Sequence, residues 1–189
     1  SAGNEANDAQ HYSGTVPAAG ETDYVRVNVA TSELPISILC FNLVWYDGLG
    51  TCNDLDLHYY DLSHNELTNI TNEQSESVRG TESELSYYNC FVSPGSSYYL
   101  KVHNNSSNSQ LFHIYFAGMG AVTFLNPDPS YTIGTPADAD NAIAVGAYTI
   151  RDSWTDYQGN SWISGETANT VTSFSSHGPR VDDFQKPNI

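Results

Sequence analysis

The sequence predicts a mainly β protein organised around an antiparallel sandwich. Apolar and polar residues alternate over residues 24–29, 54–60 and 97–103, as in strands with one buried face. Stretches rich in Asn, Ser and Gly separate these runs, and a helical period is almost absent from residue 16 to residue 118. Several short strands joined by regular turns are typical of a sandwich or a jelly roll.

The remaining strands are predicted from longer apolar runs. Ile36–Trp45 is long enough to cross a sandwich core, and Leu111–Phe116 closes the set. Further along, Ile143–Tyr148 predicts a buried strand after a turn. Val171–Ser175 predicts a strand that ends before a Gly-Pro turn.

The composition excludes several classes of partner. The chain has 22 acidic and 6 basic residues and a formal charge of −16. A nucleic-acid partner is excluded because affinity for phosphate comes from clustered Lys and Arg. No apolar run approaches the length of a membrane span, so no membrane insertion is expected. An acidic surface suits an extracellular or salt-tolerant protein.

The chain has three cysteines, Cys40, Cys52 and Cys90. An odd count permits one disulfide and a free thiol. Cys40 lies in an apolar run that suits a small buried thiol. Cys52 and Cys90 both flank turn-like sequence and form the preferred pair, although the sequence does not fix the pairing. The spacing Cys-x-x-Cys does not occur, which disfavours a structural zinc site.

Four residues near one strand start are candidate calcium ligands. Asp54 and Asp56 are two residues apart, so their side chains point to the same face of the strand. With Asp47 and Asn53 nearby, they offer oxygen ligands of the kind Ca²⁺ prefers. Solvated acids at a strand end are the alternative interpretation, since Ca²⁺ takes six or more oxygens.

Three stretches resemble the subtilisin-like serine proteases, or subtilases, and occur in the order of that family. They are Ser1-Ala-Gly-Asn4, the run from Pro136 to Ala147, and Phe174-Ser-Ser-His-Gly-Pro179 followed by Lys186-Pro-Asn-Ile189. In the last stretch Asn188 stands where the family usually has Asp. The resemblance implies a fragment of an α/β parallel-sheet core, cut out of a longer protein.

The resemblance also implies roles for four residues. The family's Asn donates a hydrogen bond to the oxyanion of the tetrahedral intermediate, and Asn4 takes that position. Ala2 and Gly3 would form part of the wall of the substrate pocket. Gly134 would lie at the base of the pocket and leave it open to a large apolar or aromatic residue. A glycine needed only for a turn is the competing interpretation of Gly134.

The predicted domain plan is a core segment at 1–16, an inserted β sandwich at 17–121 and a second core segment at 122–189. Within the insert, Leu43–Asp47 and Asn53–Leu57 resemble the β-sandwich domains appended to secreted proteases, of the pre-peptidase C-terminal and proprotein-convertase P-domain types.

The family's motifs for the catalytic Asp, His and Ser do not occur in this sequence. Ser175 and Ser176 lack a nucleophile-elbow context. We therefore expect an inactive fragment that supplies the oxyanion hole and specificity pocket of a secreted serine endopeptidase. Its partners would be a protein or peptide substrate and the remaining core segments. Two alternatives stay open: a sandwich that binds substrate, a surface polymer or Ca²⁺, and a pseudoprotease.

Overall fold

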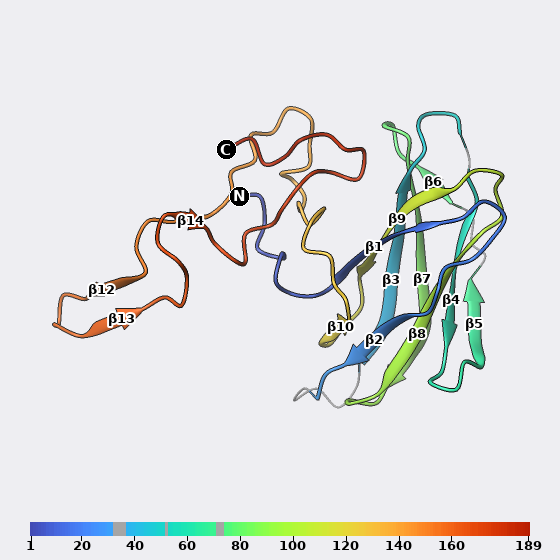
Figure 1. Cartoon of the computed structure of the whole chain (residues 1–189), viewed down its shortest axis with the longest axis horizontal. Helices are drawn as coiled ribbons and strands as arrows, with labels where there is room; N and C mark the ends of the chain where they lie inside the picture. The colour runs from blue at the N-terminus through green and yellow to red at the C-terminus, as the bar shows by residue number, and fades with distance from the viewer. Residues whose placement is uncertain (32–36, 52, 71–73) are drawn as a thin grey trace. The chain divides into compact units, whose positions relative to one another are not determined.

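The computed structural model describes residues 1–31, 37–51, 53–70 and 74–189 (Figure 1). These residues form strands, turns and loops, and none forms a helix with the length and apolar character of a membrane span. The chain divides into two compact units. The sandwich unit is Ala9–Asp128, and the flanking unit combines Ser1–Asp8 with Pro129–Ile189.

The sandwich unit contains two five-stranded antiparallel sheets, with the strand orders β1-β9-β3-β7-β6 and β10-β2-β8-β4-β5 (Figure 1). The strands are β1 (His11–Val16), β2 (Val25–Val29), β3 (Ser37–Tyr46), β4 (Leu55–Tyr60), β5 (Glu66–Ile70), β6 (Ser75–Glu76), β7 (Thr81–Val92), β8 (Ser97–Asn104), β9 (Gln110–Phe116) and β10 (Val122–Phe124).

The five strands predicted from the sandwich sequence are confirmed, within one residue at each end, as β2, β3, β4, β8 and β9. Their inward side chains form one apolar core shared by both sheets. The fully buried residues of greatest volume are Trp45, Tyr59, Phe41 and Phe112. Burial of each such side chain contributes roughly 1.5–3 kcal/mol. This core gives the sandwich unit a stabilising centre of its own.

The long strand β7 was not predicted, because its inward face is polar. Leu43, Trp45 and Phe41 of β3 lie directly opposite Glu84, Glu82 and Ser86 of β7, so these polar side chains share the buried face. The sequence of β7 therefore lacks the alternation of apolar and polar residues that indicates a half-buried strand. The sandwich unit also extends beyond the predicted limits of 17–121, because β1 and β10 pair with β9 and β2.

The flanking unit contains two small antiparallel sheets. One pairs β11 (Tyr148–Thr149) with β14 (Thr170–Val171), and the other is a hairpin of β12 (Ser153–Thr155) and β13 (Ser161–Ile163). The hairpin lies within a polar stretch, residues 151–170, that is rich in Gly, Asn and Ser. Trp154 and Trp162 are paired across it, and both remain partly exposed.

The two strands predicted for this unit are wrong over most of their length. Only Tyr148 of Ile143–Tyr148 and Val171 of Val171–Ser175 lie in a strand. A strand needs a neighbour to accept its backbone hydrogen bonds. Here Ala144 donates its N–H to the Asn188 side chain instead, and Ile143 is 73% exposed rather than buried.

The flanking unit, all of whose residues the structure describes, has little apolar core. Its buried hydrophobic side chains are those of four alanines, Ala2, Ala6, Ala137 and Ala144. Larger apolar side chains are exposed instead, including those of Ile143, Ile150 and Ile189. The burial of four alanines removes little apolar surface from water, so hydrogen bonds define much of this unit.

The free thiol of Cys40 is half-buried on β3, rather than fully buried as predicted. It lies next to the inward-facing Leu39 and Phe41, and neighbouring residues of a strand point to opposite faces. Burial raises the pKa of this thiol. Cys52 and the side chain of Cys90, the preferred disulfide pair, lie outside the described residues.

Candidate active-site pocket

Ala2 connects the N-terminal segment of the flanking unit to two later parts of the chain. Its N–H donates to Val145 O at 2.8 Å, and its carbonyl accepts from Gly134 N at 3.1 Å. The side chain of Ala2 is 1% exposed. These bonds bring Gly134 next to Ala2, as the resemblance to the subtilases implied for two residues of one pocket.

A pocket of about 360 Å³ opens in this region of the flanking unit. Gly3 and Asn4 line it together with Gly134. Three of the four predicted oxyanion and substrate-pocket residues therefore surround one cavity. The fourth, Ala2, accepts a backbone hydrogen bond from Gly134. The remaining lining residues are Ser1, Glu5, Thr135, Pro136, Ala137, Ala142 and Ile143.

Gly134 leaves open space at the pocket wall. A Cβ atom built on it would have Glu5 Oε2 as its nearest neighbour, at 3.9 Å, which is ordinary van der Waals contact. The φ angle of Gly134 lies outside the left-handed range in which side chains are strained. The backbone of this turn would therefore accept other residues. This supports the interpretation that the missing side chain keeps the pocket open.

Gly3 is under the opposite constraint. Its φ of 116° favours glycine, and a Cβ atom here would lie 2.2 Å from Glu5 Oε2 and 2.6 Å from Ser176 Oγ. Any side chain would displace both groups. The close approach explains why a glycine precedes Asn4.

Glu5 is a pocket residue that the sequence interpretation did not identify. Its Oε2 accepts hydrogen bonds from Asn4 N at 2.6 Å and from Ser176 Oγ at 2.5 Å. The only available sequence indication was its position directly after Asn4. Ser176 lies far from Glu5 in the chain, so their contact could not be inferred from spacing.

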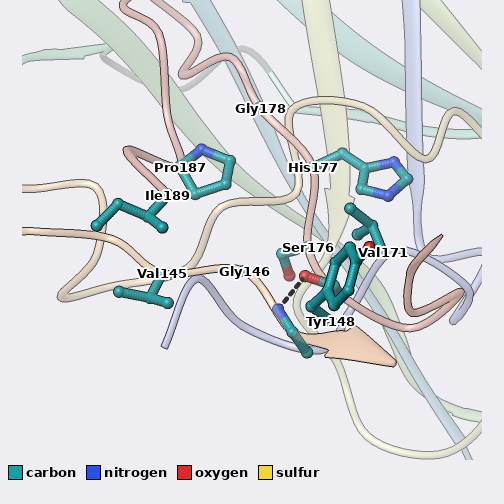
Figure 2. Close-up of a pocket in the computed structure, with 11 residues that line it drawn as sticks. Val145, Gly146, Tyr148, Val171, Ser176, His177, Gly178, Pro187 and Ile189 are labelled. Carbon is teal, nitrogen blue, oxygen red and sulfur yellow. Dashed lines mark hydrogen bonds between the residues drawn. The ribbon is translucent and has the colours of Figure 1, made fainter. Parts of the chain in front are cut away.

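A second pocket in the flanking unit, of about 570 Å³, has mostly apolar walls (Figure 2). Val145, Pro187 and Ile189 lie along one side in Figure 2, and Tyr148 and Val171 along the other. Other lining residues are Gly146, Ala147, Ser175, Ser176, His177 and Gly178.

The two serines of this second pocket are bonded to different groups. Ser175 Oγ accepts a hydrogen bond from Ala147 N at 3.0 Å. Ser176 Oγ donates to Glu5, whereas the backbone of His177 exchanges hydrogen bonds with Thr132. Both hydroxyls thus connect one backbone segment to another.

Buried cations anchor the C-terminal motif. Arg180 is 7% exposed and pairs with Asp140 at 2.6 Å and with Asp182 at 2.5 Å. The bond to Asp182 is the main cause that raises the pKa of this guanidinium above its usual range. Lys186, 4% exposed, donates to Ala142 O and to Asn188 Oδ1.

The four predicted calcium ligands lie in the sandwich unit. Asn105 Nδ2 donates to Asp54 at 3.0 Å and to Asp56 at 2.7 Å, and burial is the main cause that raises the pKa of Asp56. Asp47 instead accepts from the backbone N of Asn53 at 2.8 Å. No group of three or more acidic, His or Cys side chains suited to a metal occurs in the described part of the chain. The calcium site stays a prediction.

Solved structures provide a comparison for the fold. The CspB protease of Clostridium perfringens matches 99% of this chain with a TM-score of 0.61 and 17% sequence identity. The chain spans 39% of the length of that protease. At this identity the match shows the fold alone. A mitogen from Yersinia pseudotuberculosis matches 62% of this chain over 95% of its own length, at 15% sequence identity. Its TM-score of 0.35 is too low to show a shared fold.

The comparison with family models points to the same group of proteins. No curated protein matches the chain. The model of the subtilase family matches residues 92–189, which is more than half of the 189 residues. This match includes β8, β9 and β10 of the sandwich unit and all of the flanking unit after Asp128. The chain belongs to the subtilase family.

Proposed function

We propose that this chain supplies the oxyanion donor and part of the substrate pocket of a secreted subtilisin-like serine endopeptidase. The enzyme hydrolyses peptide bonds in proteins or peptides through an acyl-enzyme on a serine carried by another core segment. The observation that carries this proposal is the single pocket lined by Gly3, Asn4 and Gly134. Membership of the subtilase family supports the reaction class.

Asn4 acts on the charge that develops during acylation. When the serine oxygen adds to the scissile carbonyl, the carbonyl oxygen becomes an oxyanion. The Asn4 side chain donates an N–H to this oxygen without giving up its proton. A fixed neutral donor stabilises the tetrahedral intermediate more than the planar substrate, so it accelerates the chemical step rather than binding.

The pocket receives the substrate side chain that precedes the scissile bond. Its volume of about 360 Å³ and the open space at Gly134 favour a large apolar or aromatic side chain. Ala137, Ala142 and Ile143 supply apolar surface in the lining, whereas Glu5 brings one carboxylate. Binding in this pocket places the carbonyl of the same substrate residue near Asn4.

Asn4→Ala in the full-length enzyme tests the proposal. We expect kcat to fall roughly 10²–10³-fold, a range based on loss of one oxyanion donor in subtilisin itself. KM should change little, because the bond forms mainly in the transition state. Asn7→Ala is the matched control, since Asn7 is an exposed amide in the same segment and does not line the pocket.

Steady-state kinetics on a peptide ester and the corresponding amide provide the measurement. An unchanged kcat in Asn4→Ala, with a properly folded protein, would refute the oxyanion role. A full-length protein that hydrolyses neither substrate and is not labelled by a fluorophosphonate would favour a pseudoprotease.

A further inference from the structure

Ser176 and Glu5 close a hydrogen-bonded ring around the residues that carry the proposed oxyanion donor. Ser176 N donates to Gly3 O at 3.1 Å, and Ser176 Oγ donates to Glu5 Oε2 at 2.5 Å. In return, Glu5 N donates to Ser176 Oγ at 3.1 Å. The fourth bond runs from Asn4 N to Glu5 Oε2 at 2.6 Å. One serine and one carboxylate thus hold three consecutive residues.

The ring is built to be rigid. Ser176 is 1% exposed, so water competes little for its hydroxyl. Two of the four bonds are charge-assisted, and such bonds are shorter and roughly twice as strong as neutral ones. The ring also requires Gly3, because a Cβ atom there would overlap both Glu5 Oε2 and Ser176 Oγ. Hydrogen bonding and backbone conformation specify the same arrangement.

The exposed side chain of Asn4 depends on this arrangement. Asn4 is exposed and lines the pocket, and its backbone N–H donates a hydrogen bond to the Glu5 carboxylate. The position of the side-chain amide therefore follows the backbone of residues 3–5. A catalytic donor must be held within about 0.5 Å of its productive position to be effective.

We propose that Ser176 and Glu5 are positioning residues that fix the oxyanion donor Asn4 for catalysis, an inference that rests on the proposed function of Asn4. Neither residue touches the substrate oxyanion in this proposal. Their contribution is to hold the backbone of Asn4 so that its amide remains oriented when negative charge develops on the substrate.

Ser176→Ala in the full-length enzyme tests the inference. This change removes the hydroxyl from two of the four bonds. We expect kcat to fall roughly 10–100-fold with KM nearly unchanged, since small misplacements of catalytic groups have effects of that size. Ser175→Ala is the matched control. Ser175 is equally buried at 1% exposure, but its hydroxyl bonds to Ala147 N. Its loss should leave kcat within a few-fold of wild type.

A double-mutant cycle separates positioning from general damage. If Ser176 acts through Asn4, then Ser176→Ala should have little further effect on kcat in an Asn4→Ala background. If the hydroxyl matters only for folding or substrate binding, the two losses will multiply, and the inference fails. A rise in KM without a loss of kcat in the single mutant would also overturn it.

Glu5→Gln provides a second variant, which changes an exposed side chain and so carries less risk to folding. The amide oxygen still accepts both bonds but without the charge, so we expect a smaller loss of kcat than in Ser176→Ala. If Glu5→Gln lowers kcat by the same factor in the Asn4→Ala background as in wild type, Glu5 does not act through Asn4 and the inference fails. If Asn4→Ala itself leaves kcat unchanged, the proposed function fails, whatever the Ser176 and Glu5 variants show.

Discussion

Leu43 and Glu84 lie directly opposite each other on β3 and β7, which places the Glu84 carboxyl on the buried face of the sandwich unit. Leu43 is fully buried and Glu84 is 1% exposed. Burial, aided by the negative charge of Asp56, raises the pKa of Glu84 to about 8. The carboxyl is therefore largely protonated in the folded chain at neutral pH.

The stability of the sandwich unit should fall as the pH rises. In an unfolded chain Glu84 loses its proton near pH 4.5, whereas in the folded chain it keeps the proton up to about pH 8. Between these values the folded state binds more protons, so its stability decreases with pH. The part of the unfolding free energy that depends on the protonated Glu84 is fully present below pH 4.5 and is lost as the pH rises through about 8. It amounts to about a few kcal/mol.

Urea unfolding of wild type and Glu84→Gln from pH 5 to pH 9 measures this effect. We expect Glu84→Gln to flatten the decline, because the amide does not ionise. Asp23→Asn, at an exposed carboxylate of the same unit, is the control and should keep the wild-type slope. Parallel curves for wild type and Glu84→Gln would show that the buried carboxyl does not control the slope.

Substitutions at Gly134 should change substrate preference in the full-length enzyme. Gly134→Ala fits without a steric clash, because the nearest atom to the new Cβ lies 3.9 Å away. Gly134→Leu should fill part of the pocket. For substrates with Phe before the scissile bond, we expect kcat/KM to fall by roughly tenfold or more compared with substrates that have Ala at that position. Peptides that differ only at this residue give the measurement. An equal loss for both substrates would place Gly134 outside the pocket that selects this residue.

Asn188→Asp should stabilise the flanking unit. Lys186 is buried, and its ammonium bonds to two neutral oxygens, Ala142 O and Asn188 Oδ1. An aspartate would keep the oxygen that accepts from Ala144 N and would add a charge opposite Lys186. The bond from the Lys186 ammonium is already charge-assisted, and making its acceptor a carboxylate adds the attraction of an ion pair, which is worth about 1 kcal/mol.

Thermal unfolding of the full-length protein checks this expectation, with an increase in Tm as the outcome. In Lys186→Met, the substitution Asn188→Asp should lose its benefit, because a buried carboxylate without a cation is destabilising. The same gain in both backgrounds would exclude the charge pair as its cause.

Hydrogen exchange should differ between the two units of the isolated chain. Amides of β3, β8 and β9 pair within sheets that cover the apolar core, so they should be strongly protected. Amides of the β12–β13 hairpin should exchange much faster, since all six of its strand residues are exposed. Exchange monitored by mass spectrometry measures the difference. Equal protection of the hairpin and the core strands would contradict it.

The sandwich could be predicted where local pattern and burial agree. β2 and β8 have the alternation of a half-buried strand, and their inward residues do face the core. β7 lacks this alternation because Glu82, Glu84 and Ser86 occupy inward positions, where a half-buried strand usually has apolar side chains. The strand Ile143–Tyr148 was predicted from apolar composition, but in the described chain only its last residue, Tyr148, pairs with another strand.

The sequence by itself determined the family and the β-rich class, because motifs and strand periodicity are properties of the sequence. The oxyanion role of Asn4 is a prediction from the same motifs. Only the tertiary structure decided that Gly3, Asn4 and Gly134 line one pocket and that Ser176 reaches Glu5. Gly134 and Ser176 are far from residues 3–5 in the chain, and their contacts with that segment depend on hydrogen bonds that form only when the segments come together. A pattern along one strand cannot encode which distant donor will meet which acceptor.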